Sequence, residues 1–306
     1  MYQTGAARAR PAPRRSLLDS FGGPKVAPFI FIAPAVFFFL AVTIVPALMG
    51  FPLSFSRWNL LGAKAFIGLD NFREILTDPM FWKTLRNTGV YTLVGVPIEV
   101  ALALGVALLL NRDDLPLKNL FRTVYFLPVI TSTVAAVFIW EWLYHPNFGL
   151  FNYVLGKVGI DPLPWLTHPK TAMMSMIIYV VWKGLGYRTV IFLAGLQGIP
   201  KETQEAAVVD GANTWQRFWH VTLPLLRATT FLNVLTATIG SLMDFSVSYL
   251  MVGPLDSTTL VVKYIYETAF KTLRMGYASA MAMVLFAIVM LITFIQWKAR
   301  KELTYD

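Results

Sequence analysis

Long runs of apolar residues alternate with shorter polar stretches along the chain. A transmembrane helix needs about 20 consecutive, predominantly apolar residues. The pattern contains six runs of roughly that length, and we therefore predict an all-α integral membrane protein with six transmembrane helices. The predicted spans are Phe29–Met49, Val90–Leu110, Thr123–Trp140, Ala172–Leu196, Ala228–Leu250 and Met275–Trp297.

The first apolar run could also be interpreted as a secretory signal peptide. Phe29–Met49 is longer than the apolar region of such a peptide, and no small-residue cleavage site precedes Phe51-Pro52-Leu53. We expect the segment to remain in place as a membrane helix.

The polar stretch between the first two runs predicts two short helices at about 70–86, outside the cell. Asp70-Asn71 can cap the first helix, and Asp78-Pro79 supplies a cap and a helix-first proline for the second. Apolar and aromatic residues recur at helical spacing in both. Two interpretations stay open, since such helices can lie in the membrane interface or pack on the protein.

Ile199–Pro224 is the longest polar interval predicted inside the cell, and its pattern is that of a helix–turn–helix. Pro200 suits a helix start, and Glu202 and Glu205 are favourable near a helix N-terminus. Small residues follow, and Asp210-Gly211 then ends the helix, because glycine tolerates the left-handed conformation found there.

A second helix is predicted directly after that turn. Asn213 can cap it, with Gln216 at capping-box spacing. Trp215, Phe218 and Trp219 form an apolar stripe on it. A rigid bent element of this kind, placed across the mouth of a membrane bundle, is suited to transmitting force from a partner.

Composition supports lipid as the solvent. The chain of 306 residues is 56% hydrophobic and 14% charged, whereas a soluble domain carries about 25% charged residues. It has no cysteine, which excludes disulfides, thiolate metal sites and cysteine nucleophiles, and its three histidines are widely spaced. We therefore expect no metal site.

The net charge of +9 raises the possibility of nucleic-acid binding. However, no basic run is interleaved with stacking aromatic residues. Basic residues that flank membrane helices and face lipid headgroups explain the charge better, so membrane lipid is the expected partner and nucleic acid is not.

The distribution of basic residues predicts the orientation. The tail at 1–27 is rich in Arg, Ala and Pro, and we expect it to be disordered and cytoplasmic, ahead of a permease domain at 28–306. Six spans return the C-terminus to the same side, where Lys298 and Arg300 lie. The tail contains one acidic residue, Asp19. Its basic residues are Arg8, Arg10, Arg14, Arg15 and Lys25.

The predicted cytoplasmic loop also carries a family pattern. The run Glu205 to Ala212, Glu-Ala-Ala-Val-Val-Asp-Gly-Ala, with Phe218 and Leu223-Pro224 downstream, resembles the EAA loop of ABC-importer permeases. Other segments resemble the carbohydrate branch, the MalF/UgpA-like permeases, from about Phe29 to the C-terminus. These segments are Gly68–Phe72, Asn87-Thr88, Arg122–Pro128, Trp182–Tyr187 and Ala194–Pro200.

The resemblance implies a type I ABC importer permease fold in a bacterial or archaeal cell (inner) membrane. It implies that the loop forms a coupling helix against an ATPase. The residues it assigns to this coupling are Glu205, Ala206, Ala207, Asp210, Gly211 and Ala212. The implied partners are a second homologous permease, two ATP-binding subunits and an extracytoplasmic solute-binding protein.

The chain lacks the Gly-x-x-x-x-Gly-Lys-Ser/Thr motif of ATP hydrolysis. We therefore expect no enzyme activity and no cofactor in this chain, with ATP and Mg²⁺ bound by the ATPase subunits. Three positions depart from the family pattern. They are Ala228 in place of a proline, the shortened turn Met251–Pro254, and Arg188 in place of an uncharged residue.

Four ionisable residues fall inside predicted spans, namely Glu99, Lys183, Arg188 and Asp244. Such groups are costly in lipid and need a partner or a wet cavity. In one interpretation they form pairs between helices, such as Glu99 with Lys183 or Asp244 with Arg188, or extend their charged ends to the membrane surface. The other places Arg188 and Asp244 in the solute pathway, since a guanidinium binds carboxylates, phosphates or diols.

Aromatic and polar residues near these charges are further candidates for the solute pathway. Tyr187, Phe245 and Tyr249 could stack on a sugar, or serve as ordinary packing. Asn233, Ser241 and Ser246 could line a pore or form hydrogen bonds between helices.

The predicted function is a permease subunit that moves sugars or sugar-like solutes (oligosaccharides, glycerol phosphodiesters or polyols) into the cell by alternating access. A gradient-driven secondary transporter or channel is the alternative, and the EAA-like loop has no role in it. A membrane-embedded enzyme is a third hypothesis, and no catalytic constellation in the sequence supports it.

Overall fold

The fold is taken from a computed structural model, which describes residues 26–59, 62, 64–112 and 116–302. The chain divides into two compact units, Met1–Pro52 and Leu53–Asp306, and each is described by itself. The tail predicted to be disordered at 1–27 lies outside the described residues except for its last two, of which Ala27 already belongs to a helix.

The first unit is essentially one long apolar helix. Helix α2 (Ala27–Phe39) runs through a π-helical segment, η1 (Leu40–Ile44), into α3 (Val45–Ser54). Its apolar side chains point outward, as Phe29 does with 75% of its surface exposed. Residues 28–54 are long and apolar enough to cross a membrane, as predicted for the first span.

The second unit holds the remaining elements. They are β1 (Ser56–Arg57), β2 (Ala65–Phe66), α4 (Asp70–Thr77), α5 (Pro79–Leu110), α6 (Lys118–Ile130), α7 (Thr133–Leu143), α8 (Leu150–Lys157), η2 (Trp165–Thr167), α9 (Pro169–Gln197), α10 (Lys201–Val209), α11 (Thr214–Arg217), η3 (Phe218–Thr222), α12 (Leu223–Leu225), α13 (Arg227–Leu242), α14 (Ser246–Leu250), η4 (Pro254–Asp256), α15 (Val261–Phe270) and α16 (Met275–Glu302). The two strands pair antiparallel, with Ser56 opposite Phe66.

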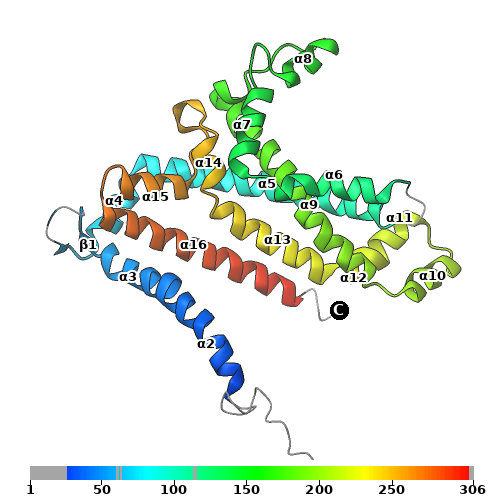
Figure 1. The fold of residues 1–306 in the computed structure, drawn as a ribbon, viewed down its shortest axis with the longest axis horizontal. Helices are drawn as coiled ribbons and strands as arrows, with labels where there is room; N and C mark the ends of the chain where they lie inside the picture. The colour runs from blue at the N-terminus through cyan, green and yellow to red at the C-terminus, as the bar shows by residue number, and fades with distance from the viewer. Residues whose placement is uncertain (1–25, 60–61, 63, 113–115, 303–306) are drawn as a thin grey trace, which may run out of the picture. The chain divides into compact units, whose positions relative to one another are not determined.

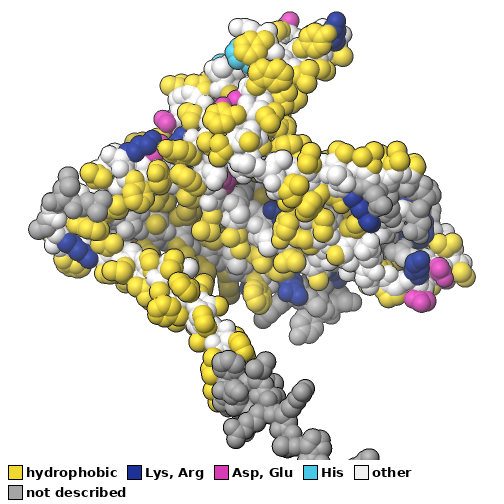
Figure 2. Space-filling view, in the orientation of Figure 1, with side chains coloured by type: hydrophobic (Ala, Val, Ile, Leu, Met, Phe, Trp, Pro, Cys, Tyr) yellow, Lys and Arg dark blue, Asp and Glu magenta, His cyan; other side chains and the backbone are white. Residues whose placement is uncertain are grey.

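Helices α5, α9, α13 and α16 form the bundle at the centre of this unit (Figure 1). Helix α5 packs along α9 and also contacts α13 and α15, while α16 packs on α15, α13 and α4. Small buried residues such as Ala103 and Ala107 let α5 approach its neighbours closely. Figure 2 shows hydrophobic side chains over much of the visible face, with charged side chains gathered where α10 lies.

The described residues contain five helices long and apolar enough to cross a membrane, or six if one bent pair counts as a span. The fourth and sixth predicted spans are confirmed as the single helices α9 and α16. The second predicted span is part of a longer helix, and the third and fifth predicted spans are each divided into two helices.

The prediction of a separate second external helix before span two is wrong. Residues 79–110 form one helix, α5. Its polar residues are satisfied by other parts of the chain. The side chain of Asn87 donates to the carbonyls of Asp256 (2.9 Å) and Thr259 (3.0 Å).

The third predicted span is not one straight helix. Helices α6 and α7 meet at an angle of 103° across Thr131 and Ser132. Pro128 has no amide hydrogen to donate, and its carbonyl accepts from the Thr131 hydroxyl at 2.7 Å. The hydropathy stays high across this break, which is why the apolar pattern does not reveal it. Figure 1 shows α7 and α8 projecting away from the bundle beyond the bend.

The fifth predicted span has the expected extent but consists of two helices, α13 and α14. The chain leaves the helical path at Asp244, whose carboxylate accepts from the amide of Val247 at 3.2 Å. A carboxylate in this position stabilises the start of a new helix. Asp244 therefore ends one helix and begins the next.

Asp78 joins the starts of α5, α15 and α16. Its carboxylate caps α5 through the amides of Met80 and Phe81, and it accepts from the hydroxyls of Tyr264 (2.8 Å) and Tyr277 (2.7 Å). Burial raises the pKa of Asp78, but the hydrogen bonds from Tyr277, Tyr264 and the two amides outweigh it and hold this pKa below its ordinary value. Burial and the bond to Asp78 raise the pKa of Tyr264 to about 12.

We expect the stabilising effect of Asp78 to depend on pH. A carboxylate with a lowered folded-state pKa stabilises the fold above its unfolded pKa of about 3.9, and this contribution is lost as pH falls through the folded pKa. Asp78→Asn keeps the helix cap and does not titrate. Thermal unfolding of the purified protein should therefore show wild type more stable at pH 7 and the difference shrinking below about pH 4. A difference independent of pH would contradict this account.

Candidate functional site

The loop between α9 and α13 folds as the predicted helix–turn–helix. Helix α10 ends in a turn in which the amide of Ala212 donates to the carbonyl of Ala207 and that of Gly211 to Val208. Gly211 has a φ of +80°, a left-handed conformation that glycine adopts without strain. This pair of bonds is a Schellman motif, which fixes the direction in which the chain leaves α10.

The second helix of the loop begins with the predicted capping box. The side chain of Asn213 accepts from the amide of Gln216, and the Gln216 side chain accepts from the amide of Asn213, both at 2.9 Å. Rings of Trp215, Phe218 and Trp219 contact one another at centroid distances of 5.2 to 6.2 Å. The loop is therefore stiffened at both sides of its turn.

The surface of α10 is left open within the chain. Glu205, Ala206 and Asp210 are exposed, Ala207 is partly buried, and Val209 is 87% exposed. Small side chains beside an exposed valine leave room for another protein to approach the helix closely. This surface, made of Glu205, Ala206, Val209 and Asp210, is called the α10 face below.

Inside the bundle, Arg188 on α9 forms an ion pair with Glu99 on α5. Its Nε donates to Glu99 Oε1 at 2.6 Å, and Nη1 donates to the carbonyl of Asn233 (3.0 Å) and to Thr236 Oγ1 (3.3 Å) on α13. The side chains of Arg188 and Glu99 are only 12% and 9% exposed. The guanidinium thus ties three helices together at one level.

Pairing between helices is confirmed, but the partners named as examples are wrong. Glu99 pairs with Arg188 rather than Lys183, and Asp244 accepts from the hydroxyl of Tyr91 at 2.7 Å. The rotation of each helix, which the spacing leaves undetermined, decides the partner. Lys183 and Arg188 are five residues apart, about 140° around the helix, and they point to different neighbours.

Lys183 instead forms hydrogen bonds to the backbone at the bend between α6 and α7. Its ammonium donates to the carbonyls of Pro128 and Thr131, the latter at 2.6 Å. These carbonyls belong to the C-terminal end of α6, where a cation is favoured by the helix dipole. Lys183 therefore satisfies the carbonyls that the broken span exposes.

An aromatic surface lies beside Asp244. Phe245 contacts Tyr249 (5.0 Å between centroids) and Tyr266 (4.8 Å), and Tyr266 contacts Phe270 (5.0 Å). Tyr249, Tyr266 and Phe270 are 39%, 37% and 59% exposed. These four rings, contributed by α14, α15 and the residue before α14, are called the aromatic surface below.

The structure brings only some of the predicted pathway residues together. Phe245, Tyr249 and Asp244 are neighbours, whereas Tyr187 is 55% exposed and takes part in none of the described ring contacts. Asn233 is fully buried, with its side-chain amide donating to the carbonyl of Thr229. Ser241 donates to Thr92 on α5, a hydrogen bond between helices.

Sequence reasoning missed four residues of this region, namely Tyr91, Thr236, Tyr266 and Phe270. Tyr266 and Phe270 are four residues apart, and the pattern of α15 could have indicated that their rings share one face. Nothing in the sequence indicates that Tyr91 meets Asp244. Among the described residues, no group of three or more His, Asp or Glu side chains is arranged to hold a metal ion.

Comparisons with known proteins agree with this architecture. Residues 83–299 match the family described as binding-protein-dependent transport system inner membrane component. The probable ABC transporter permease protein YesP of Bacillus subtilis is 40% identical over 281 residues, 90% of each chain. The arabinooligosaccharides transport system permease protein AraP of the same organism is 34% identical, covering 92% of this chain and 90% of the relative.

A solved structure has the same fold. It is a bacterial alginate ABC transporter in complex with an alginate pentasaccharide-bound periplasmic protein. One of its chains superimposes with a TM-score of 0.77 and 23% identity, covering 92% of this chain and 96% of that chain.

Proposed function

The chain belongs to the family of binding-protein-dependent transport system inner membrane components, and from that premise we propose that it is the permease subunit of an ATP-driven sugar importer. It is a multi-pass membrane protein with the type I ABC importer permease fold, which confirms the family predicted from the coupling loop. The relative AraP, a permease protein of arabinooligosaccharide transport, supports a sugar or oligosaccharide as the solute.

The observation that carries the proposal is the α10 face, which is exposed, apolar at Val209 and rigidly joined to the bundle. We assign it to contact with an ATPase subunit, with Glu205, Ala206, Ala207, Asp210, Gly211 and Ala212 forming the coupling loop. Because the Schellman turn and the capping box link α10 to α13, movement of α10 would be passed to the bundle. Nucleotide and Mg²⁺ would bind on the ATPase subunits, and this chain would carry no catalytic group.

The proposed assembly has this permease, a second homologous permease, two ATPase subunits and an extracytoplasmic solute-binding protein. Both termini would be cytoplasmic, in a bacterial or archaeal cell membrane. The permeases would expose the solute pathway alternately to the two sides as the ATPase dimer closes and opens.

The aromatic surface is the proposed place of contact with the sugar. Flat rings offer apolar faces to the C–H faces of a sugar, whereas the Asp244 carboxylate is engaged with the Tyr91 hydroxyl and the Val247 amide. Tyr187, Arg188 and Asn233, the other predicted pathway residues, are less suited in this conformation. Arg188 is engaged with Glu99, Asn233 is buried and Tyr187 lies apart.

Uptake by the reconstituted assembly tests the function. The copurified complex, in proteoliposomes with ATP inside and binding protein outside, should import an oligosaccharide and hydrolyse ATP faster when solute is present. Uptake by this chain alone, driven by an ion gradient without ATPase subunits, would instead establish the alternative of a secondary transporter.

A variant of the aromatic surface tests the place of contact. Tyr249→Ala should raise the half-saturating solute concentration about five- to tenfold, the loss expected when an aromatic contact of about 1 kcal/mol is removed. Tyr153→Ala removes another exposed ring, 64% exposed, on α8 and should leave uptake unchanged. Equal half-saturation in Tyr249→Ala and wild type would exclude this ring from solute binding.

A further inference from the structure

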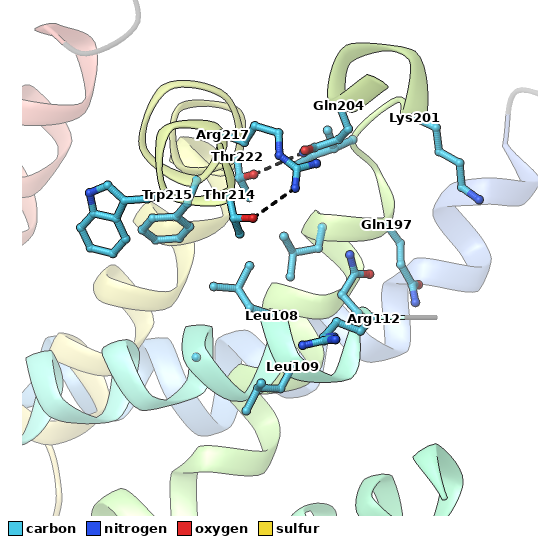
Figure 3. Close-up of a pocket in the computed structure, with 15 residues that line it drawn as sticks. Leu108, Leu109, Arg112, Gln197, Lys201, Gln204, Thr214, Trp215, Arg217 and Thr222 are labelled. Atoms are coloured by element: carbon cyan, nitrogen blue, oxygen red, sulfur yellow. Dashed lines mark hydrogen bonds between the residues drawn. The ribbon is translucent and has the colours of Figure 1, made fainter. Parts of the chain in front are cut away.

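A cavity of about 1060 Å³ lies between the coupling loop and the ends of α5 and α9. Leu108 and Leu109 on α5 and Phe218 in the coupling loop give it apolar walls. Figure 3 shows Arg217 and Gln204 on one side of the space and Leu108 and Leu109 on the other. The cavity therefore combines an apolar wall with a polar rim.

The rim is cationic. Lys201, Arg217 and Arg112 line the cavity, and none of the described lining residues is Asp or Glu. Asp113 and Asp114, which follow Arg112, lie outside the described residues, and Lys201 and Arg217 are the cations that come from the loop between α9 and α13.

Arg217 lines the cavity, and its guanidinium is weakly engaged within the chain. Its Nη2 donates to Thr214 Oγ1 at 3.5 Å, and its buried Nε has no hydrogen-bond partner. A buried donor without an acceptor is costly, and the planar guanidinium matches the geometry of a phosphate group. An anion seated in the cavity would accept from the Nη groups of this guanidinium.

Exposed tryptophans indicate the depth of the cavity in the membrane. Trp215, which also lines the cavity, is 69% exposed, and Trp219 one turn later is 47% exposed. Tryptophan side chains are enriched at the level of the lipid headgroups. The two tryptophans therefore favour a position of the cavity mouth at the level of the lipid headgroups.

We propose that this cavity binds the headgroup of an anionic phospholipid. The phosphate lies at Arg217, with Lys201 contributing positive charge elsewhere on the rim, and the beginning of an acyl chain lies along Leu108, Leu109 and Phe218. A neutral sugar would leave the cations unpaired, and a soluble phosphate ester would leave the apolar wall unused. The lipid bridges the coupling loop and α5, so it braces the element that the proposed function assigns to ATPase contact.

Lipid binding to the assembled importer tests the site without reference to transport. Native mass spectrometry of the complex, titrated with phosphatidylglycerol or phosphatidylcholine, should show preferential retention of phosphatidylglycerol. Arg217→Gln should weaken phosphatidylglycerol binding about fivefold, the effect of removing one basic contact to an anionic lipid. Lys298→Gln removes an equal charge from α16, away from the cavity lining, and should weaken phosphatidylglycerol retention less than Arg217→Gln does.

A cavity-filling variant gives a second test that changes no charge. Gly105 lines the cavity, and a Cβ added there would meet no atom within 4 Å, so Gly105→Leu can fold and fill the space. It should lower phosphatidylglycerol retention, whereas Gly156→Leu, at an equally open position on α8, should not.

Three results would overturn the proposal. They are wild-type phosphatidylglycerol affinity in both Arg217→Gln and Gly105→Leu, equal retention of phosphatidylcholine, and complete displacement of the lipid by glycerol phosphate. The last would assign the site to a soluble phosphate ester. Since none of these measurements depends on solute uptake, failure of this site and failure of the proposed function are distinguishable.

Discussion

Gly211→Pro should abolish solute uptake and separate ATP hydrolysis from solute binding while the protein stays in the membrane. Proline fixes φ near −65°, whereas Gly211 has a φ of +80°. Proline also lacks the amide hydrogen that Gly211 donates to the carbonyl of Val208. The turn would open, and α10 would no longer move as one body with α13.

The measurement is uptake and solute-stimulated ATPase activity of the reconstituted complex. Gly159→Pro is a matched control, because Gly159 also has a positive φ, of +76°, but follows α8 outside the coupling loop. It should impose a similar local strain, of about 1–3 kcal/mol, and leave ATPase activity coupled to the solute.

Glu205→Lys tests the same interface without disturbing the turn. Glu205 is exposed on α10, so the reversed charge should leave the chain folded and act only on the contact with the ATPase. We expect uptake to be lost and the ATPase subunits to copurify poorly. Normal uptake in both Gly211→Pro and Glu205→Lys would refute the assignment of this loop to coupling.

The second large effect is expected at the ion pair between Glu99 and Arg188. Removing one partner of a buried pair leaves an uncompensated charge, which costs about 3–5 kcal/mol. Arg188→Met and Glu99→Gln should each lower the unfolding temperature of the purified protein strongly. The double variant should recover most of the loss, since it leaves no unpaired charge.

The exposed pair of Arg274 with Glu74 is the control for this experiment. It has a similar N–O distance, 2.6 Å, but its side chains are 47% and 45% exposed. Such pairs contribute about 0–1 kcal/mol, so Arg274→Met should have little effect. A stable Arg188→Met variant with altered solute preference would instead identify Arg188 as a solute ligand.

The apolar runs were sufficient to predict the membrane class and most of the spans. A segment of about 20 apolar residues has no stable alternative to a membrane helix, whatever its neighbours are. The coupling loop was predictable for a related reason. Its caps and its turn at Gly211 depend on residues within a few positions of one another, so local sequence determines its shape.

The continuity of the helices depended on contacts that the local pattern does not contain. Asn87 is polar at a predicted helix boundary, yet α5 continues through it because carbonyls of Asp256 and Thr259, distant in sequence, accept its hydrogens. Lys183 reaches from α9 to the carbonyls at the bend after α6.

The sequence by itself determined that this chain is a bundle of apolar helices with a helix–turn–helix in its loop between α9 and α13. Burial in lipid and helix capping depend on residues that are close together in the sequence. Only the tertiary structure decided which charges meet. Helix rotation and packing placed Arg188 on Glu99 and Tyr91 on Asp244, and they gathered Tyr266 and Phe270 beside Phe245. Side-chain partners across a bundle follow from the relative rotation of helices, which no single segment encodes.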